Sequence, residues 1–137
     1  MKKFGLIIFI TIFGFSANAN NQVELLFHVG VGADEQYRIG GTIQNNTSLV
    51  IEHAAITYLI LDEKCYPKSA QTATFNQLPQ HQAFEFSIPV SGTLYGYKIL
   101  SFTAYDSMGS EYKAEDTTLK ILQEREEDRK NTCQKLR

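Results

Sequence analysis

Residues 49–62 read LVIEHAAITYLILD, and this stretch decides the fold class. It is rich in β-branched residues, and both of its alternating sets of side chains are apolar. One set contains Ala54, Ile56, Tyr58 and Ile60, and the other contains Ala55, Leu59 and Leu61. Two apolar faces are typical of a strand that is central and covered, or that is covered by a partner chain. Exposed aliphatic side chains on the second face are the other interpretation.

Period-two alternation predicts further strands on both sides of this stretch. Their ranges are 22–29, 36–44, 69–75, 82–90, 97–105 and 111–122. Segments rich in Gly, Asn, Asp and Pro separate them and predict turns, among them 30–35 (GVGADE) and 45–48 (NNTS). The chain is therefore expected to be all-β, an immunoglobulin-like or fibronectin III-like sandwich of about seven strands.

Two of these strands carry finer expectations. In 36–44, the Gly40-Gly41 pair predicts a bulge or a close approach of neighbouring backbone. In 97–105, alternation places Leu100, Phe102 and Ala104 on one face. We expect that face to pack in the core.

The first 19 residues have the pattern of a secretory signal peptide. Lys2 and Lys3 precede an apolar run over 4–15, and Ala17-Asn18-Ala19 is a small-x-small cleavage pattern. The apolar run is shorter than the roughly 20 residues that a membrane span needs, and no cysteine follows it to carry a lipid. We expect residues 20–137 to form one mature domain without a membrane anchor, secreted or periplasmic.

The charge of the chain argues against a nucleic-acid partner. The sequence has 13 Lys and Arg residues against 15 Asp and Glu residues, and loss of Lys2 and Lys3 makes the mature net charge about −4. The basic residues are scattered rather than clustered. A phosphate backbone requires a basic patch, so binding to nucleic acid is not expected.

Two cysteines, Cys65 and Cys133, predict one disulfide in an exported protein. No Cys-x-x-Cys motif is present, and no second metal ligand lies at suitable spacing beside either cysteine, so a redox or metal pair is the weaker alternative. From residue 123 the chain is polar and rich in helix formers (QEREEDRKNTCQKLR). Such a short helix is marginal alone, so we expect a helix over 123–137 that the disulfide tethers. An untethered tail is the other interpretation.

The sequence contains no candidate catalytic, cofactor-binding or metal-binding set. The three histidines, His28, His53 and His81, lie in or beside different predicted strands with no second histidine at ligand spacing. Neither a nucleophile elbow nor a phosphate loop that leads into a helix is present. We therefore expect a protein that is not an enzyme and that needs no cofactor.

Three tyrosines are candidate protein-contact residues. Tyr95 and Tyr97 flank Gly96 near a predicted loop, and Tyr66 lies in the turn that contains Cys65. Tyrosine on a loop offers a large, stiff contact area at low entropic cost. The alternative is that these tyrosines cap the ends of the core and form local hydrogen bonds.

Several short motifs follow one another in a distinctive order. GTIQNNT (41–47) precedes the long strand, and Phe75-x-x-Leu78-Pro79, FEF (84–86) and SFTAYD (101–106) come after it. This order resembles the FxLYD-type β-sandwich domains of bacterial exported proteins, over roughly residues 37–106. Each motif mostly records turn chemistry and alternation, so the resemblance depends on their order.

In size, leader, cysteine pair and sandwich pattern, the chain also resembles fibronectin III-like bacterial mimics of interleukin receptors. That resemblance implies a secreted virulence protein that binds host interleukins, a class of cytokine, as a domain-swapped homodimer. The Trp-Ser-x-Trp-Ser signature of cytokine receptors is absent, because the chain has no tryptophan. The other interpretation is a periplasmic or envelope structural or assembly accessory protein that acts through an exposed sheet edge.

Overall fold

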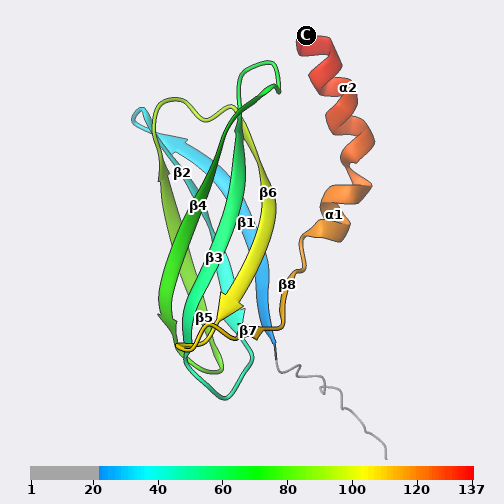
Figure 1. The fold of residues 1–137 in the computed structure, drawn as a ribbon. Coiled ribbons are helices and arrows are strands. Elements are labelled where there is room, and N and C mark those ends of the chain that lie inside the picture. The colour runs from blue at the N-terminus through cyan, green and yellow to red at the C-terminus, as the bar shows by residue number, and fades with distance from the viewer. Residues whose placement is uncertain (1–21) are drawn as a thin grey trace, which may run out of the picture.

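The computed structural model describes residues 22–137, so the expected signal peptide lies outside the described residues. Two four-stranded sheets pack face to face, and a helical segment runs alongside them (Figure 1). One sheet has the strand order β5-β2-β1-β8, and the other has the order β4-β3-β6-β7. The expected all-β sandwich with a short C-terminal helix is confirmed. Within residues 22–137, no helix is long and apolar enough to cross a membrane.

The strands follow the predicted order, with the last one divided in two. The bounds are β1 (Val23–Ala33), β2 (Gln36–Asn45), β3 (Ile51–Leu61), β4 (Pro67–Leu78), β5 (Gln82–Val90), β6 (Gly96–Tyr105), β7 (Glu111–Tyr112) and β8 (Ala114–Asp116). Two helices, α1 (Leu119–Glu124) and α2 (Glu126–Leu136), complete the chain. Helix α1 lies where the sequence predicted the end of the last strand.

Strand β3 has two apolar faces in different surroundings. It pairs with β4 on one side and with β6 on the other. Its inner set is buried in the core between the sheets, and its outer set is half-buried. The core consists of apolar side chains from six strands and of Tyr58: Val23, Leu25, Ile39, Ile43, Ile51, Ala54, Ile56, Tyr58, Ile60, Leu78, Phe86, Ile88, Ile99, Phe102 and Ala104.

The β1–β2 hairpin is tighter than predicted, because residues 30–33 belong to β1 rather than to a turn. Only Asp34 and Glu35 form the turn, with φ values of 52° and 65°, the positive values that a two-residue type I′ turn requires. Gly32 is needed for close packing instead. A Cβ atom there would lie 2.6 Å from the ring of Tyr37.

The predicted close approach at the glycine pair is confirmed at Gly41. A Cβ atom on this residue would lie 2.1 Å from the carbonyl oxygen of Phe27. The irregularity in pairing lies in the neighbouring strand, where Leu26 of β1 has no partner in β2. A side chain at residue 41 would therefore push the two strands apart.

The predicted inner face of β6 was wrong at Leu100. The register between β3 and β6 shifts at this point and leaves Leu100 without a partner. Leu100 is 49% exposed, while its neighbour Ile99 is buried. Such a bulge reverses the alternation of side chains, which period-two reasoning cannot anticipate.

The predicted strand over 111–122 was also wrong beyond residue 116. Asp116 Oδ1 accepts hydrogen bonds from the backbone amide of Thr118, at 2.9 Å, and from its hydroxyl. This turn ends β8 and leads directly into α1. A short apolar run such as LKIL fits a strand or a helix equally well by periodicity, so the local turn decided the outcome.

The GTIQNNT motif has a structural role at one end of the sandwich. Asn45 and Thr47 are almost fully buried. The side-chain amide of Asn45 donates to the carbonyls of Leu49, Leu78 and Pro79 at 2.9, 3.1 and 3.0 Å. Its Oδ1 accepts from the amide and hydroxyl of Thr47 at 2.9 and 2.7 Å. One side chain thus joins the β2–β3 connection to the end of β4.

Candidate functional site

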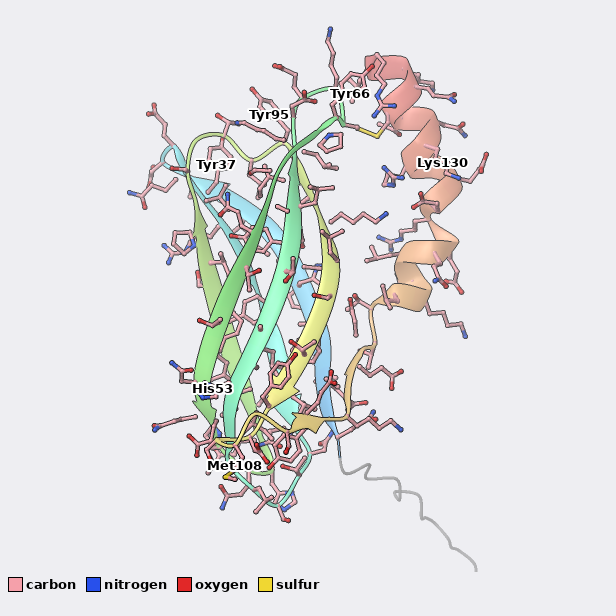
Figure 2. All side chains as sticks on the ribbon, in the orientation of Figure 1. Tyr37, His53, Tyr66, Tyr95, Met108 and Lys130 are labelled. Carbon is pink, nitrogen blue, oxygen red and sulfur yellow. A yellow bond between two sulfur atoms is a disulfide. The ribbon has the colours of Figure 1, made fainter. Side chains whose placement is uncertain are left out.

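Three tyrosines gather at the end of the sandwich opposite Met108, and we call this surface the tyrosine end. Figure 2 shows Tyr37, Tyr66 and Tyr95 there, on or beside three different connections between strands. Tyr66 is 48% exposed and Tyr95 is 60% exposed. Two of the three candidate contact residues therefore lie exposed on one surface.

The turn that presents Tyr66 is fixed by its own hydrogen bonds. The Asp62 carboxylate accepts from the backbone amides of Lys64 and Tyr66 at 2.8 and 2.9 Å. The bond from Tyr66 and, to a smaller extent, the bond from Lys64 hold the pKa of Asp62 below its usual value. The Asp62 amide donates to the carbonyl of Tyr66 at 2.9 Å. The turn is consequently rigid, and it carries Tyr66 outward.

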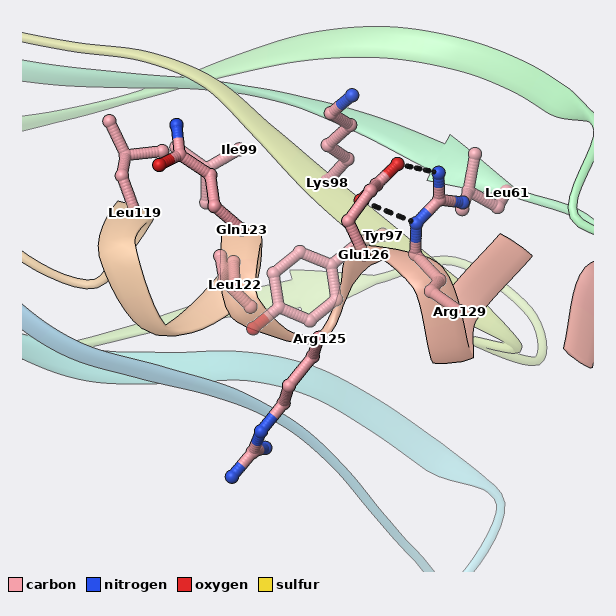
Figure 3. A pocket seen from close by; sticks show the side chains of 10 residues that line it. All are labelled: Leu61, Tyr97, Lys98, Ile99, Leu119, Leu122, Gln123, Arg125, Glu126 and Arg129. Carbon is pink, nitrogen blue, oxygen red and sulfur yellow. Dashed lines mark hydrogen bonds and ion pairs between the residues drawn. The ribbon is translucent and has the colours of Figure 1, made fainter. Parts of the chain in front are cut away.

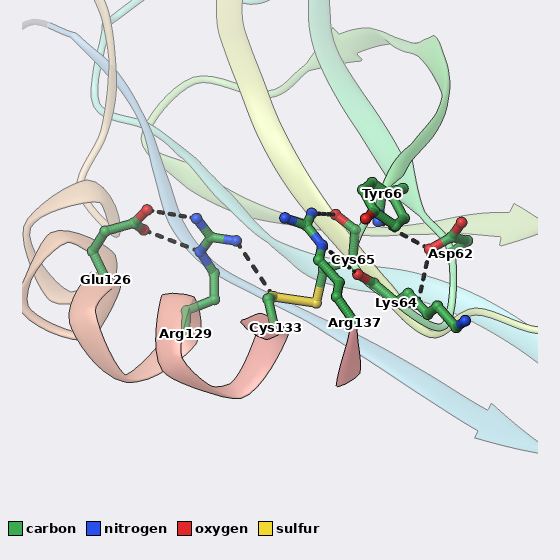
Figure 4. The surroundings of a disulfide bond; sticks show 8 residues. All are labelled: Asp62, Lys64, Cys65, Tyr66, Glu126, Arg129, Cys133 and Arg137. Atoms are coloured by element: carbon green, nitrogen blue, oxygen red, sulfur yellow. Dashed lines mark hydrogen bonds and ion pairs between the residues drawn. A yellow bond between two sulfur atoms is a disulfide. The ribbon is translucent and has the colours of Figure 1, made fainter. Parts of the chain in front are cut away.

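The predicted disulfide is confirmed, and it joins this same turn to α2 (Figure 4). The Cα atoms of Cys65 and Cys133 are 5.6 Å apart. Arg137 adds hydrogen bonds to the carbonyls of Lys64 and Cys65 at 2.9 and 3.0 Å. Its guanidinium lies 4.1 Å from the ring centroid of Tyr66, a cation–π contact. The end of the chain therefore orders the ring of Tyr66.

A shallow hollow lies beside Tyr95 on the tyrosine end. Its volume is about 230 Å³, and it is formed by the β1–β2 hairpin together with the β5–β6 connection and the start of β6. Val31, at its margin, is 51% exposed. The lining residues are Gly30, Val31, Gly32, Tyr37, Leu94, Tyr95, Gly96 and Tyr97. The tyrosine end thus combines exposed aromatic side chains with a small depression.

Tyr97 has a different environment from Tyr66 and Tyr95. Its hydroxyl lies 2.6 Å from Nδ1 of His28, and the two rings meet edge to face at 5.5 Å. Burial, together with the nearby charge of Asp116, raises the pKa of Tyr97 to about 12. Tyr97 thus links β1 to β6 through a hydrogen bond to a residue 69 positions away, and it is less exposed than Tyr66 and Tyr95.

His28 connects Tyr97 to the start of α1. The Thr118 hydroxyl donates to Asp116, so it accepts from Nε2 of His28 at 2.9 Å. Nδ1 then accepts from the Tyr97 hydroxyl, which defines a neutral imidazole. Burial lowers the pKa of His28, and Asp116 opposes this in part. Sequence reasoning missed this network, because its four residues lie on separate elements.

The other two histidines do not join this network. Nδ1 of His53 lies 3.1 Å from the side-chain oxygen of Asn76 across the β3–β4 pair. His81 lies in the β4–β5 turn with a φ of 56°. Over residues 22–137, no group of three or more His, Cys, Asp or Glu side chains is placed to hold a metal ion.

Comparison with protein-family models gives no match, and comparisons with curated proteins and with solved structures give none either.

Proposed function

We propose that the protein is a secreted, non-enzymatic binding module that holds a protein partner at the tyrosine end. The observation that carries the proposal is the exposure of Tyr66 and Tyr95 on neighbouring loops. Exposed tyrosines on ordered loops are enriched in protein-binding surfaces. The disulfide indicates an oxidising compartment outside the cytosol, in keeping with export.

The rigidity of this surface supports a binding role. Tyr66 is held by the Asp62 turn, by the disulfide and by Arg137. A side chain that is ordered before binding loses less conformational entropy when a partner covers it. The partner class, host interleukins, and the homodimeric form follow from the resemblance to interleukin-receptor mimics.

The interleukin proposal is tested by measuring the affinity of the purified, disulfide-bonded protein for a panel of interleukins. We expect one or more to bind, and Tyr66→Ala or Tyr95→Ala to weaken binding by about tenfold or more. Met108→Ala is the matched control, because Met108 is 87% exposed at the opposite end. Absence of binding, or equal losses in all three variants, contradicts the proposal.

The proposed homodimer is tested independently by light scattering on a size-exclusion column. A mass twice that of the single chain is expected. Domain swapping predicts in addition that monomer and dimer exchange slowly, because strands must leave one sandwich to join the other. A monomeric mass at all concentrations contradicts the proposed homodimer. It does not contradict the proposal that the tyrosine end binds a protein partner.

A second candidate function is an accessory role in the cell envelope through an exposed sheet edge. The observation that favours it is the edge position of β4, which pairs with β3 alone along its 12 residues. An unpaired edge can accept a strand from another protein. Fractionation separates the two functions, because recovery from the culture medium favours the first and retention in the periplasm favours the second.

A further inference from the structure

A groove separates α1 and the start of α2 from the sandwich (Figure 3). Its volume is about 620 Å³. Leu61, Tyr97 and Ile99 line it from the sandwich, and Leu119 and Leu122 line it from α1. The polar lining residues are Lys98, Gln123, Arg125, Glu126 and Arg129. Volumes of about 300–1,000 Å³ with a mostly apolar lining are typical of small-molecule sites.

The groove exists because the helical segment is attached at its two ends. We call α1 and α2 together the strut. Before its first residue, the amide and hydroxyl of Thr117 donate to the carbonyl of Leu25 at 3.1 and 2.9 Å. Near its last residue, Cys133 is bonded to Cys65. Between these points α1 buries no residue and α2 buries only Cys133, so the strut spans the groove without filling it.

The apolar side chains of α1 are left without a cover in this arrangement. Leu119 is 47% exposed and Leu122 is 41% exposed, and both line the groove. Exposed aliphatic surface is unfavourable in water by roughly 25 cal/mol per Å². An apolar chain placed in the groove would bury these side chains against Ile99 and Leu61 of the sandwich.

The charges around the groove favour an anion. Glu126, its one acidic lining residue, is engaged by Arg129 at 2.5 and 3.1 Å. Two further cations, Lys98 and Arg125, line the groove, and Figure 3 shows their side chains extending away from each other. The chain as a whole has a formal net charge of −2. The lining residues thus carry a positive excess in an otherwise acidic protein.

We propose that this groove binds a single-chain anionic amphiphile, a long-chain carboxylate of the fatty-acid type. The alkyl chain lies against Leu122, Leu119 and Ile99, and the carboxylate is held by Arg125. A guanidinium is suited to this head group, because its parallel N–H groups match the two oxygens of a carboxylate. The groove shares Tyr97 with the hollow on the tyrosine end but not the exposed Tyr66 or Tyr95, and the proposal does not depend on the proposed function.

The experiment is titration calorimetry of laurate into the purified, lipid-free protein with its disulfide formed. We expect saturable binding of one laurate per chain. Dodecanol and dodecylamine have the same chain without the negative charge, so their affinities should be about tenfold lower. Equal binding of dodecylamine, or no saturable binding of laurate, overturns the proposal.

Matched variants on α1 locate the site. Leu122→Asp should weaken laurate binding by about tenfold or more, whereas Ile121→Asp should not, because Ile121 is on the same helix but does not line the groove. Arg125→Ala should weaken binding, and Lys120→Ala, also outside the lining, should leave it unchanged. Circular dichroism confirms the fold of each variant. Equal effects within either pair place the ligand elsewhere and overturn the proposal.

Discussion

The sandwich and the strut are held in place by different means. The sandwich encloses fifteen mutually packed apolar and aromatic side chains, several of them with no exposed surface. The strut buries a single residue, Cys133, and it is positioned by point attachments at its two ends. Burial of apolar side chains stabilises the sandwich. The strut is held instead by one disulfide and a few hydrogen bonds.

This difference indicates where function can be added at low cost in stability. Every side chain of the core is constrained by its neighbours, since interiors are close-packed. The strut and the tyrosine end present side chains whose surroundings are open. Substitutions in the core are therefore expected to change stability more than substitutions in the strut.

The largest effect is expected from opening the disulfide. Cys65→Ser with Cys133→Ser should lower the free energy of unfolding by roughly 4 kcal/mol in the chain-entropy model, because the bridge closes a loop with a sequence separation of 68. Urea titration of both proteins measures it. A loss below about 1 kcal/mol would mean that the strut detaches while the sandwich stays intact, which would make the two regions independent.

Two isoleucines compare the regions directly. Ile56→Ala should cost about 2–5 kcal/mol, because Ile56 is fully buried in the core. Ile121→Ala in the strut should change stability by less than about 0.5 kcal/mol, since Ile121 is 52% exposed. Urea unfolding of both variants is the measurement. Similar losses would show that the strut is part of the cooperative core.

Loss of a polar contact should also lower stability more in the sandwich than in the strut. Asn45→Ala should cost about 1–3 kcal/mol, because it removes the side-chain donor to the carbonyls of Leu49, Leu78 and Pro79, the second of these in a buried bond. Arg137→Ala removes an exposed clamp and should cost less than about 1 kcal/mol. Thermal unfolding of both proteins ranks them, and the reverse order would contradict the distinction.

The smallest effect concerns the pH dependence of the attachment at His28. Its pKa in the folded protein lies below the ordinary value of 6.5, because burial disfavours the charged ring. Neutral His28 thus contributes stability that is present above pH 6.5 and is lost as the pH falls through the folded pKa. Tyr97 remains protonated throughout this pH range, because its pKa is raised. The nearby Asp116 raises the pKa of His28 and so partly offsets the effect of burial.

Hydrogen exchange of the amides around 117–122 as a function of pH measures this effect. The protection factors there, which correct for the slower intrinsic exchange at low pH, should fall on acidification from pH 7 to 5 more than those in β3 do. His28→Gln should remove the pH dependence, while His53→Gln should preserve it, because His53 is exposed on β3. A pH dependence that survives in the His28 variant would assign it to another group.

Alternation was a reliable guide wherever the strands were regular. The predicted range 82–90 agrees with β5, and its phenylalanines and Ile88 point inward as expected. Of the two apolar faces of β3, one is buried in the core and the other is half-buried on the outside of the sheet. The prediction failed at Leu100, where a register shift changes which residues face the core. The register depends on both strands of a pair, so it cannot be predicted from the pattern of one strand alone.

The candidate site was predictable only in part. Tyr66 and Tyr95 lie exposed near their predicted loops, but Tyr97 packs against His28. Nothing in the sequence indicated that contact, because residues 28 and 97 are 69 positions apart. The disulfide was predictable, since an exported chain with two cysteines has one simple pairing.

The all-β class, the long apolar strand and the covalent bridge could be predicted from the sequence, because alternation, turn chemistry and cysteine count are local properties. Three tyrosines share one end, His28 is hydrogen-bonded to Thr118 at the start of α1, and the strut leaves a groove, and none of this could be predicted before the fold was known. These features depend on which distant residues come together. Those contacts form when the two sheets pack together and when the strut is attached to the sandwich at its two ends.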